Sequence, residues 1–321
     1  MENIAIILPA YNEELTISET IVDFNCALPD AQIWVINNAS TDKTEKVAND
    51  VFCAIGCKGG VLNEDRPGKG NAVRCGFSEI DADIYVLADA DMTYPAEQVH
   101  TLIKPILAGR ADMVVGDRHS SGHYAAQNKR PLHGFGNRLV RALVNRLFLA
   151  NLRDIMSGYR VFTRRFVKNY PILVAGFEIE TDMTLHALDK KFRIVELPIN
   201  YKDRPEGSVS KLNTLTDGVQ VLITIATVLR HYRPMVFFGT GAIVLALFSL
   251  LAGYPVIEEW LMTKYISHVP LAILASGLAL SALVFGAIGL ILDSIAFQER
   301  RSFERHLLSQ TSTPTIQKRF D

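Results

Sequence analysis

The sequence predicts an α/β domain built on a mostly parallel sheet, followed by two transmembrane helices. Two observations predict this architecture. In the N-terminal part of the chain, strand-like and helix-like stretches take turns, which is typical of βαβ units and a parallel sheet. From Pro234 onward the chain instead contains two long uncharged runs, at residues 235–253 and 270–292. Each run is long enough to span the roughly 30 Å hydrocarbon core of a bilayer.

The alternation can be followed element by element. IAIILPA predicts a first strand, with a helix from Glu13 to about Ala27 after it, and QIWVIN predicts a second strand, with a helix from about Thr41 to Phe52. GGVLNE predicts the third strand and GKGNAVRCGFSEI the next helix. IYVLADAD predicts the fourth strand, and a further helix begins in PAEQVHTLI.

A polar cluster follows each of these four strands. PAYNEE follows the first strand, NNASTDKT the second, NEDRPGKGN the third and DADMTYP the fourth. Ligands of parallel sheets bind outside the carboxyl ends of the strands. We therefore expect the four clusters to converge on one cleft.

Charged residues around the two uncharged runs predict how the chain crosses the membrane. These residues are Arg230, His231 and Arg233 before the first run, Arg300, Arg301 and Arg305 after the second, and Glu258, Glu259 and Lys264 between them. By the positive-inside rule both termini are cytoplasmic, as expected for a multi-pass protein of the inner membrane. The start MENIAIILPAYNEE has no basic segment and too short an apolar run for a signal peptide. Buried core helices are the alternative, but two such runs in succession favour membrane spans.

These boundaries predict four parts: a cytoplasmic domain at 1–211, an interfacial amphipathic helix at 212–233, two transmembrane helices within 234–297 and a cytoplasmic tail at 298–321. A helix packed on the soluble domain is an open alternative for residues 212–233. The formal net charge of −1 gives no sign of a nucleic-acid partner. The four cysteines are interpreted as packed thiols, because Cys53 and Cys57 match no common zinc spacing.

Two aspartates one residue apart, in VLADADMTYP, follow the fourth strand. Their mutual repulsion is unfavourable unless a cation lies between them, and Mg²⁺ and Mn²⁺ favour carboxylate and phosphate oxygens. Asp89 and Asp91 are therefore the candidate metal ligands. Capping of the following helix is the alternative role. PGKGN resembles a P-loop, but Gly70 stands in place of the Ser or Thr and Asn63 in place of the upstream glycine, which disfavours a Walker nucleotide triphosphatase.

The ordered set of motifs resembles glycosyltransferase family 2, in the branch of dolichyl-phosphate mannose synthases and bacterial polyprenyl-phosphate glycosyltransferases. It consists of LPAYNEE, NNASTDKT, GKGNAVRCGF, DADMTYP, GDR, SGYRVF and RPEGSVSK, and covers about residues 3–212. The ordered set is much more specific than any one motif. The resemblance implies a GT-A fold, a nucleotide-sugar donor, Mg²⁺ or Mn²⁺, and an isoprenoid phosphate acceptor.

The resemblance also implies a nucleotide-sugar site. In it, Asp91 is the firmer metal ligand and Asp89 lies between the metal and the nucleotide. Asn38 stands where relatives often have an aspartate, and because an amide both donates and accepts, base selectivity cannot be copied from them. A plain turn is the alternative reading of NNASTD. The remaining residues that the resemblance assigns to this site are Pro9, Tyr11, Glu13, Lys69, Ala88, Ala90, Arg118 and Lys211.

Basic residues in the second half of the soluble region are candidates for binding phosphate groups. Guanidinium forks suit phosphate oxygens, although a lone surface arginine is more often only a solvated charge. Their places in matching motifs favour the functional interpretation. The resemblance assigns Arg160, Arg204, Ser210 and Lys211 to the lipid phosphate, and brings Arg118 and Lys211 to the donor diphosphate as well.

The candidate catalytic residues are Asp91, Arg118, Asp154 and Arg160. Asp154 either orients the phosphate pocket or pairs with a neighbouring arginine as part of the structure. A phosphomonoester acceptor is largely a dianion near neutral pH, since its second pKa is about 6, so no strong general base is required.

The sequence thus predicts inverting, metal-dependent transfer of a hexose from a UDP- or GDP-linked sugar to polyprenyl phosphate at the cytoplasmic face of the membrane. Two alternatives remain: a family 2 enzyme with a glycan or diacylglycerol acceptor, and a catalytically silent membrane scaffold. The expected partners are the donor, the lipid acceptor and the bilayer, with self-association through the membrane helices left open.

Overall fold

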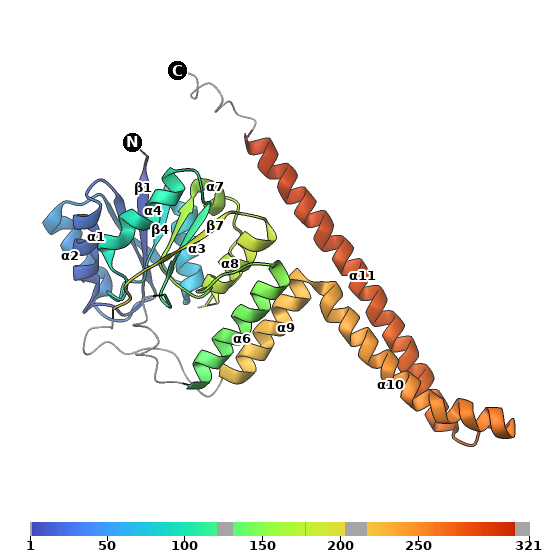
Figure 1. Ribbon diagram of the computed structural model, residues 1–321. Helices are drawn as coiled ribbons and strands as arrows, with labels where there is room; N and C mark the ends of the chain where they lie inside the picture. The colour runs from blue at the N-terminus through green and yellow to red at the C-terminus, as the bar shows by residue number, and fades with distance from the viewer. Residues whose placement is uncertain (1, 121–130, 177, 203–216, 312–321) are drawn as a thin grey trace. The chain divides into compact units, whose positions relative to one another are not determined.

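The protein is described by a computed structural model over residues 2–120, 131–176, 178–202 and 217–311 (Figure 1). Two compact units divide the chain, Met1–Leu215 and Thr216–Asp321. The first contains a β-sheet with helices on its faces. The described part of the second consists of helices and the short segments that join them.

A seven-stranded sheet forms the centre of the first unit, within the residues that the structure describes. The strand order is β3-β2-β1-β4-β6-β5-β7. Strands β1 to β4 pair in parallel, and β6 runs antiparallel to both of its neighbours. The predicted mostly parallel sheet is confirmed. The strands are β1 (Ile4–Ala10), β2 (Gln32–Asn38), β3 (Gly59–Glu64), β4 (Ile84–Leu87), β5 (Met113–Asp117), β6 (Arg160–Thr163) and β7 (Ile194–Pro198).

Helices cover both faces of this sheet, which is why β4 and β5 are apolar almost throughout and buried along their whole length. On one face Ile6 and Leu8 belong to the core beneath α1 and α4. On the other, a Cβ at Gly76 of α3 would lie 2.9 Å from Cγ2 of Ile7, so glycine allows the helix to approach the sheet. The helical segments of this unit are α1 (Ile17–Ala27), α2 (Thr44–Ile55), α3 (Lys69–Glu79), η1 (Ala96–Gln98), α4 (Val99–Leu107), α6 (Pro131–Phe148), α7 (Arg164–Val167) and α8 (Ile179–Asp189).

Helices α1 and α2 begin a few residues later than the sequence predicts. The backbone N–H of Glu13 donates to Oγ1 of Thr44 at 2.8 Å, and that of Asn12 donates to Oγ of Ser40 at 3.1 Å. The residues before each helix therefore bind the neighbouring loop instead of continuing the helix. Asp42 accepts from the backbone N–H of Thr44 at 2.9 Å, which satisfies a donor of the first turn of α2.

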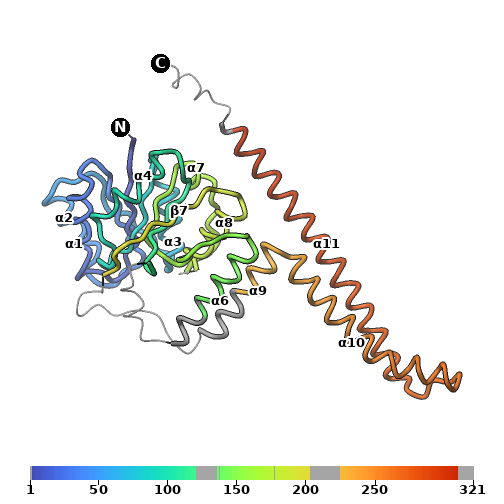
Figure 2. The backbone as a smooth tube through the Cα atoms, in the orientation of Figure 1, coloured from blue at the N-terminus to red at the C-terminus, as the bar shows by residue number. Residues whose placement is uncertain are grey.

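The second unit consists of α9 (Asp217–Tyr232), α10 (Pro234–Thr263) and α11 (Val269–Thr311) in its described part. Figure 2 shows α10 and α11 running side by side. Small residues line their contact: Oγ of Ser249 donates to the carbonyl of Ala275 at 2.8 Å, and a Cβ at Gly253 would meet that of Ala275 at 3.7 Å. Small side chains of this kind let membrane helices approach closely.

Helices α10 and α11 are long and apolar enough to cross a membrane, by length and composition. The ends of these helices differ from the ends of the predicted membrane spans. Helix α10 continues to Thr263, so Glu258 and Glu259 lie in its last turns and not in the connection, which is shortened to residues 264–268. Helix α11 continues through the predicted boundary at residue 297 without a break.

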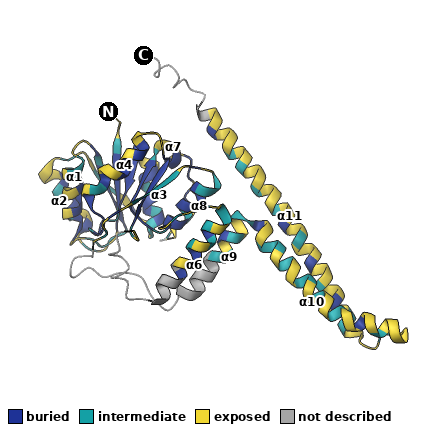
Figure 3. Cartoon of the chain, viewed as in Figure 1, coloured by how far each residue is buried: buried dark blue, intermediate teal, exposed yellow. Residues whose placement is uncertain are grey.

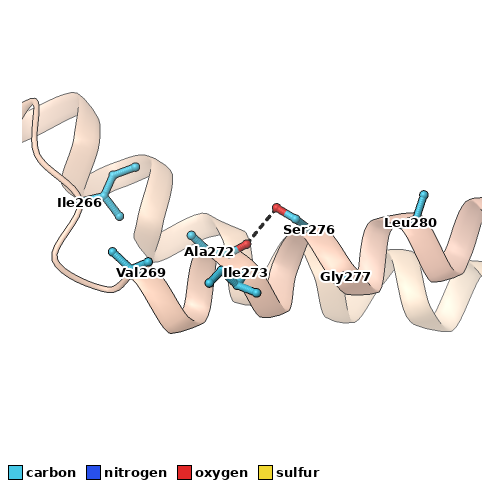
Figure 4. A pocket seen from close by; sticks show the side chains of 7 residues that line it. All are labelled: Ile266, Val269, Ala272, Ile273, Ser276, Gly277 and Leu280. Carbon is cyan, nitrogen blue, oxygen red and sulfur yellow. Dashed lines mark hydrogen bonds between the residues drawn. The ribbon is translucent and has the colours of Figure 1, made fainter.

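A hollow of about 530 Å³ lies on the surface of the second unit, between Ile266 and Leu280 (Figure 4). Its lining is aliphatic apart from Ser276, whose hydroxyl donates to the carbonyl of Ala272 at 2.9 Å. The hollow therefore presents mainly hydrocarbon, and it shares no residue with the polar groups of the first unit.

Candidate active site

Polar side chains from four strand ends and from α8 meet in the first unit. The best connected is Lys69, at the start of α3, which donates to a carboxylate oxygen of Asp89 and, at 2.5 Å, to Oε1 of Glu180. Asp89 follows β4, and Glu180 lies in the first turn of α8. We call these three residues, together with Asp91 two positions after Asp89 in the chain, the carboxylate cluster. Three separate elements thus supply one charged group of side chains.

Asp91 is held in a tight turn directly after β4. Its Oδ1 accepts from the backbone N–H of Thr93 at 3.2 Å and from the Thr93 hydroxyl at 2.6 Å. Met92 between them has φ of +61°, in the left-handed region. The helix-capping alternative finds no support here, because Pro95 and Gln98 occupy the N-cap positions that follow and neither cap has a side-chain hydrogen bond.

Lys69 stays charged although it is deeply buried. Burial by itself would lower the pKa of the Lys69 ammonium, but the carboxylates of Asp89 and Glu180 outweigh it and raise the pKa above its ordinary value. The sequence assigned Lys69 to the nucleotide sugar and said nothing of Glu180. The sequence offered no distinct signal for Glu180, because α8 reads IETDMTLHALD and contains several other polar residues.

The two glycines of PGKG allow the backbone of residues 174–175 to pack closely against the start of α3. A Cβ at Gly68 would lie 2.2 Å from the carbonyl oxygen of Ala175, and one at Gly70 would lie 2.2 Å from that of Val174. The N–H of Gly70 donates to the Ala175 carbonyl at 2.8 Å. The start of α3 is therefore covered by residues 174–175, which agrees with the sequence-based exclusion of a P-loop.

Asn38 braces the same loop. Its Nδ2 donates to the carbonyls of Glu64 at 3.2 Å and Arg66 at 2.6 Å, and its Oδ1 accepts from the N–H of Gly68 at 2.7 Å. The side chain is buried. Asn38 therefore fixes the loop after β3, because both ends of its amide bind backbone that a carboxylate could bind only in part. A contact with the nucleotide stays a prediction.

Arg118 and Asp154 form a bidentate ion pair. Nε of Arg118 donates to Oδ2 of Asp154 at 2.7 Å, and Nη2 donates to Oδ1 at 3.0 Å. Burial would raise the pKa of Asp154, but the Arg118 guanidinium outweighs it and holds that pKa below its ordinary value. Of the two alternatives for Asp154, pairing with an arginine is the one observed.

Tyr94 and Tyr201 lie between this ion pair and the carboxylate cluster. The Arg118 guanidinium lies 5.7 Å from the ring centroid of Tyr201, whose ring centroid is 5.5 Å from that of Tyr94. The Tyr94 hydroxyl accepts from the N–H of Gly158 at 2.9 Å, and a Cβ at Gly158 would lie 3.0 Å from both Asp89 and Lys69. The two sets of charges therefore belong to one site. Neither tyrosine was singled out in the sequence.

Arg160 requires a correction. Its guanidinium was expected to contact the lipid phosphate, but the residue is fully buried. Nε donates to the carbonyl of Ser157 at 2.7 Å, Nη2 to that of Ile155 at 2.8 Å and Nη1 to Oγ1 of Thr184 at 2.9 Å. A guanidinium bound in this way holds the 155–157 loop against α8, so its role is internal.

The other assigned residues occupy varied positions. Pro9, the next-to-last residue of β1, is half-buried, Tyr11 is 43% exposed, and an oxygen of Glu13 accepts from the hydroxyl of Thr16. Ala88 and Ala90 are buried, and the Ala90 carbonyl accepts from the Thr16 hydroxyl at 2.8 Å. The remaining assigned residues, which lie outside the described part of the chain, are Arg204, Ser210 and Lys211.

The carboxylate cluster fits a divalent cation that takes part of its ligands from a substrate. Within the described residues there is no group of three His, Cys, Asp or Glu side chains arranged to hold a metal. Mg²⁺, however, is commonly bound by one or two carboxylates together with substrate phosphates and water. Asp89 and Asp91 can supply that number of ligands, so the residues fit an ion that is completed by a diphosphate.

Comparison with protein families matches residues 5–170 to the model of glycosyl transferase family 2. The chain is 28% identical over 303 residues to glycosyltransferase AglJ of Haloferax volcanii. The alignment covers 94% of this chain and 96% of AglJ. It is 29% identical over 211 residues to the undecaprenyl-phosphate mannosyltransferase of Micrococcus luteus, covering 63% of this chain and 84% of that protein.

Among solved structures, the chain is similar to glucosyl-3-phosphoglycerate synthase from Mycobacterium tuberculosis in complex with Mn²⁺, UDP and glucosyl-3-phosphoglycerate. The TM-score is 0.54 and the identity 23%, with 71% of this chain and 79% of the other covered. At this identity the likeness concerns the fold alone, and it agrees with the predicted GT-A architecture.

Proposed function

The chain belongs to glycosyltransferase family 2, and on this premise we propose that it transfers a hexose from a UDP- or GDP-linked sugar to polyprenyl phosphate, with inversion at the anomeric carbon. The observation that carries the proposal is the pair Asp89 and Asp91 at the carboxyl end of the central strand β4, in a chain that also has two long apolar helices. The similarity to an undecaprenyl-phosphate mannosyltransferase supports the choice of acceptor.

In the donor half of the site, Asp89 and Asp91 would hold Mg²⁺ or Mn²⁺ together with the diphosphate of the nucleotide sugar. When bound, the cation neutralises the charge that grows on the diphosphate as the glycosidic bond breaks. Lys69 and Arg118 add positive charge at the same site. Tyr11, exposed at the end of β1, is proposed to contact the base or ribose.

In the acceptor half, an oxygen of the lipid phosphate attacks the anomeric carbon opposite the leaving group. The new carbon–oxygen bond forms as the bond to the diphosphate breaks, and the nucleoside diphosphate departs with that electron pair. No proton has to be removed, because the phosphate is already largely a dianion. Arg204 and Ser210 are proposed to bind this phosphate, with Lys211 near both phosphate groups; Arg160 is not included, because it is buried.

The membrane helices would keep the site near its lipid substrate. We propose that residues 1–211 form a cytoplasmic catalytic domain, that 212–233 lie at the interface, and that both termini are cytoplasmic. A cysteine at Ser267, in the short connection, should react with an impermeant reagent outside intact cells, while one at Ser309, in the last turn of α11, should react only after lysis. The reverse labelling pattern would place the catalytic domain outside the cytoplasm and contradict the proposed topology.

The decisive experiment supplies the purified, lipid-reconstituted protein with a panel of nucleotide sugars. Each donor is tested with undecaprenyl phosphate, with diacylglycerol, with a glycan acceptor and with none of these. Glycosylated undecaprenyl phosphate as the product is the expected result. Transfer to diacylglycerol or to the glycan would replace the acceptor, and no turnover with any pair would favour a catalytically silent scaffold.

A further inference from the structure

Lys69 is shared by two carboxylates that differ in exposure. The Lys69 side chain is 9% exposed and that of Glu180 is 7% exposed, whereas that of Asp89 is 28% exposed. Asp89 is therefore the partner that a solute can reach, and Glu180 is the partner inside the protein. Because the Lys69 ammonium binds both carboxylates, it neutralises each of them only in part.

Several charged groups lie close to this lysine. Asp89 and Glu180 each interact electrostatically with Lys69, and Glu180 also interacts with the buried Arg160. In surroundings of low polarity one unit of charge shifts the energy of a neighbouring ion by several times more than it would in water. The number of negative charges beside Lys69 should therefore affect any cation that binds to Asp89.

The geometry is fixed by backbone contacts that have no role in holding a ligand. The Ala175 carbonyl accepts from Gly70 beside Lys69, and Glu180 follows on α8 a few residues later. Gly158 closes the other side, where a Cβ would lie 3.0 Å from Oδ2 of Asp89 and from Nζ of Lys69. The backbone at Gly158 therefore lies close to the ion pair of Lys69 and Asp89.

We propose that Glu180 is a positioning residue that draws part of the Lys69 charge away from Asp89 and so sets the affinity of Asp89 and Asp91 for a divalent cation. This inference rests on the proposed metal-dependent function. Without the Glu180 carboxylate, the ammonium binds Asp89 alone and competes with the cation. Without Lys69, that competitor is absent and the site gains net negative charge.

The test measures Mn²⁺ binding to the full-length protein by electron paramagnetic resonance of the free ion, with Mn²⁺ alone and again with UDP or GDP present. Glu180→Gln should weaken Mn²⁺ binding about tenfold, and Lys69→Met should tighten Mn²⁺ binding measured alone. The double variant removes one charge of each sign, so its Kd for Mn²⁺ should return to within about threefold of the unsubstituted protein. Glu178→Gln is the matched control: this exposed carboxylate accepts from the N–H of Gly176 at 3.2 Å, and its loss should leave the Kd unchanged.

The two single variants are expected to change the Kd for Mn²⁺ in opposite directions. A loss of structure would weaken Mn²⁺ binding in both, so the experiment distinguishes a charge effect from unfolding. An unchanged Kd in Glu180→Gln, or a double variant that binds as weakly as Glu180→Gln, would overturn the positioning role. If Glu180→Gln does not fold, the Lys69→Met and double variants still decide, since Mn²⁺ binding must tighten in the first and return in the second. Absence of Mn²⁺ binding in the unsubstituted protein would overturn the metal part of the proposed function and this inference together. Normal Mn²⁺ binding without transfer to undecaprenyl phosphate would overturn only the acceptor.

Discussion

The two units of the molecule differ in which side chains they bury and which they expose. The first unit buries its apolar residues and also several charges, such as Asp154 and Arg160, whereas the second exposes aliphatic residues such as Leu250, which is 69% exposed (Figure 3). Apolar surface is stable only away from water. The first unit achieves this within its own core, whereas the exposed aliphatic residues of α10 and α11 need another apolar environment, which a bilayer would supply. Buried charges in the first unit are stable because each has specific partners.

The largest expected effect tests whether a buried charge in the first unit is structural. Arg160→Ala removes the donors to the carbonyls of Ser157 and Ile155 and leaves the nearby Glu180 less compensated. Breaking such a buried charged group costs about 3–5 kcal/mol of folding free energy, which should appear as a lower midpoint in chemical denaturation.

The matched control is Arg164→Ala, four residues along the chain. Arg164 pairs with Asp81 at 2.9 Å, but both side chains are more than half exposed. Its loss should shift the denaturation midpoint much less. Small and equal shifts of the denaturation midpoint in the two variants, together with a raised KM for polyprenyl phosphate in Arg160→Ala alone, would contradict the structural role. They would indicate that Arg160 binds the acceptor phosphate.

The second prediction compares equally apolar, exposed leucines in the two units. Leu250→Asp places a charge near the centre of α10, where membrane insertion should become less favourable by about 2.5–3.5 kcal/mol. Leu107→Asp, at the end of α4 in the first unit, changes a leucine that is 55% exposed and should have little effect. A glycosylation-mapping insertion assay on α10 and thermal denaturation of both proteins measure the difference. Normal insertion of the Leu250 variant would mean that α10 does not face lipid at this position.

The third prediction concerns Asp91, the buried member of the acidic pair in the first unit. Asp91→Asn keeps the shape of the turn and its contact with Thr93 but removes a charge that the proposed cation requires. Transfer should fall on the order of 10²-fold or more, which corresponds to about 2.7 kcal/mol or more, with little change in the unfolding midpoint.

Asp65→Asn is the control, because Asp65 is an exposed carboxylate in the loop after β3. Its activity should stay near that of the unsubstituted protein. Near-normal transfer by Asp91→Asn, or full activity in excess chelator, would remove the metal from the proposed mechanism.

Most of the fold could be predicted because it rests on local patterns. Strands β1 and β3 have the predicted bounds and β2 is one residue longer, since apolar runs between turn residues mark buried parallel strands. Strand β4 ends at Leu87, four residues before the end of the predicted stretch, because the chain turns at Asp89 and Asp91. The helix starts were less accurate. Hydrogen bonds between the first two loops, such as Glu13 to Thr44, decide where α1 and α2 begin, and no local pattern contains them.

The site could be predicted only where its residues follow strands in order. Asp89 and Asp91 were predicted in this way, but Glu180, which also contacts Lys69, lies 111 residues from it in the chain. Arg160 was misread for the same reason: its motif indicates an arginine near the site, and only the packing of Ile155, Ser157 and Thr184 around it shows that the guanidinium points inward. Side-chain direction depends on contacts between distant segments, which a single sequence does not specify.

The smallest expected effect concerns how stability in the first unit depends on pH. Asp112 is buried and Arg193 is half exposed, and Nε of Arg193 donates to Oδ2 of Asp112 at 3.0 Å. Burial raises the pKa of Asp112, but hydrogen bonds from Arg193 outweigh it, so the folded-state pKa lies below its ordinary value of 3.8. A carboxyl with a lowered pKa stabilises the fold above the unfolded-state pKa and loses that contribution as the pH falls through the folded-state pKa. Because solvent screens the exposed arginine, Asp112→Asn should cost about 1 kcal/mol at pH 6. The difference between the two proteins in denaturant-induced unfolding should shrink below about pH 4. A difference that stays constant from pH 6 to pH 3 would mean that the contacts of Asp112, and not its charge, stabilise this part of the sheet.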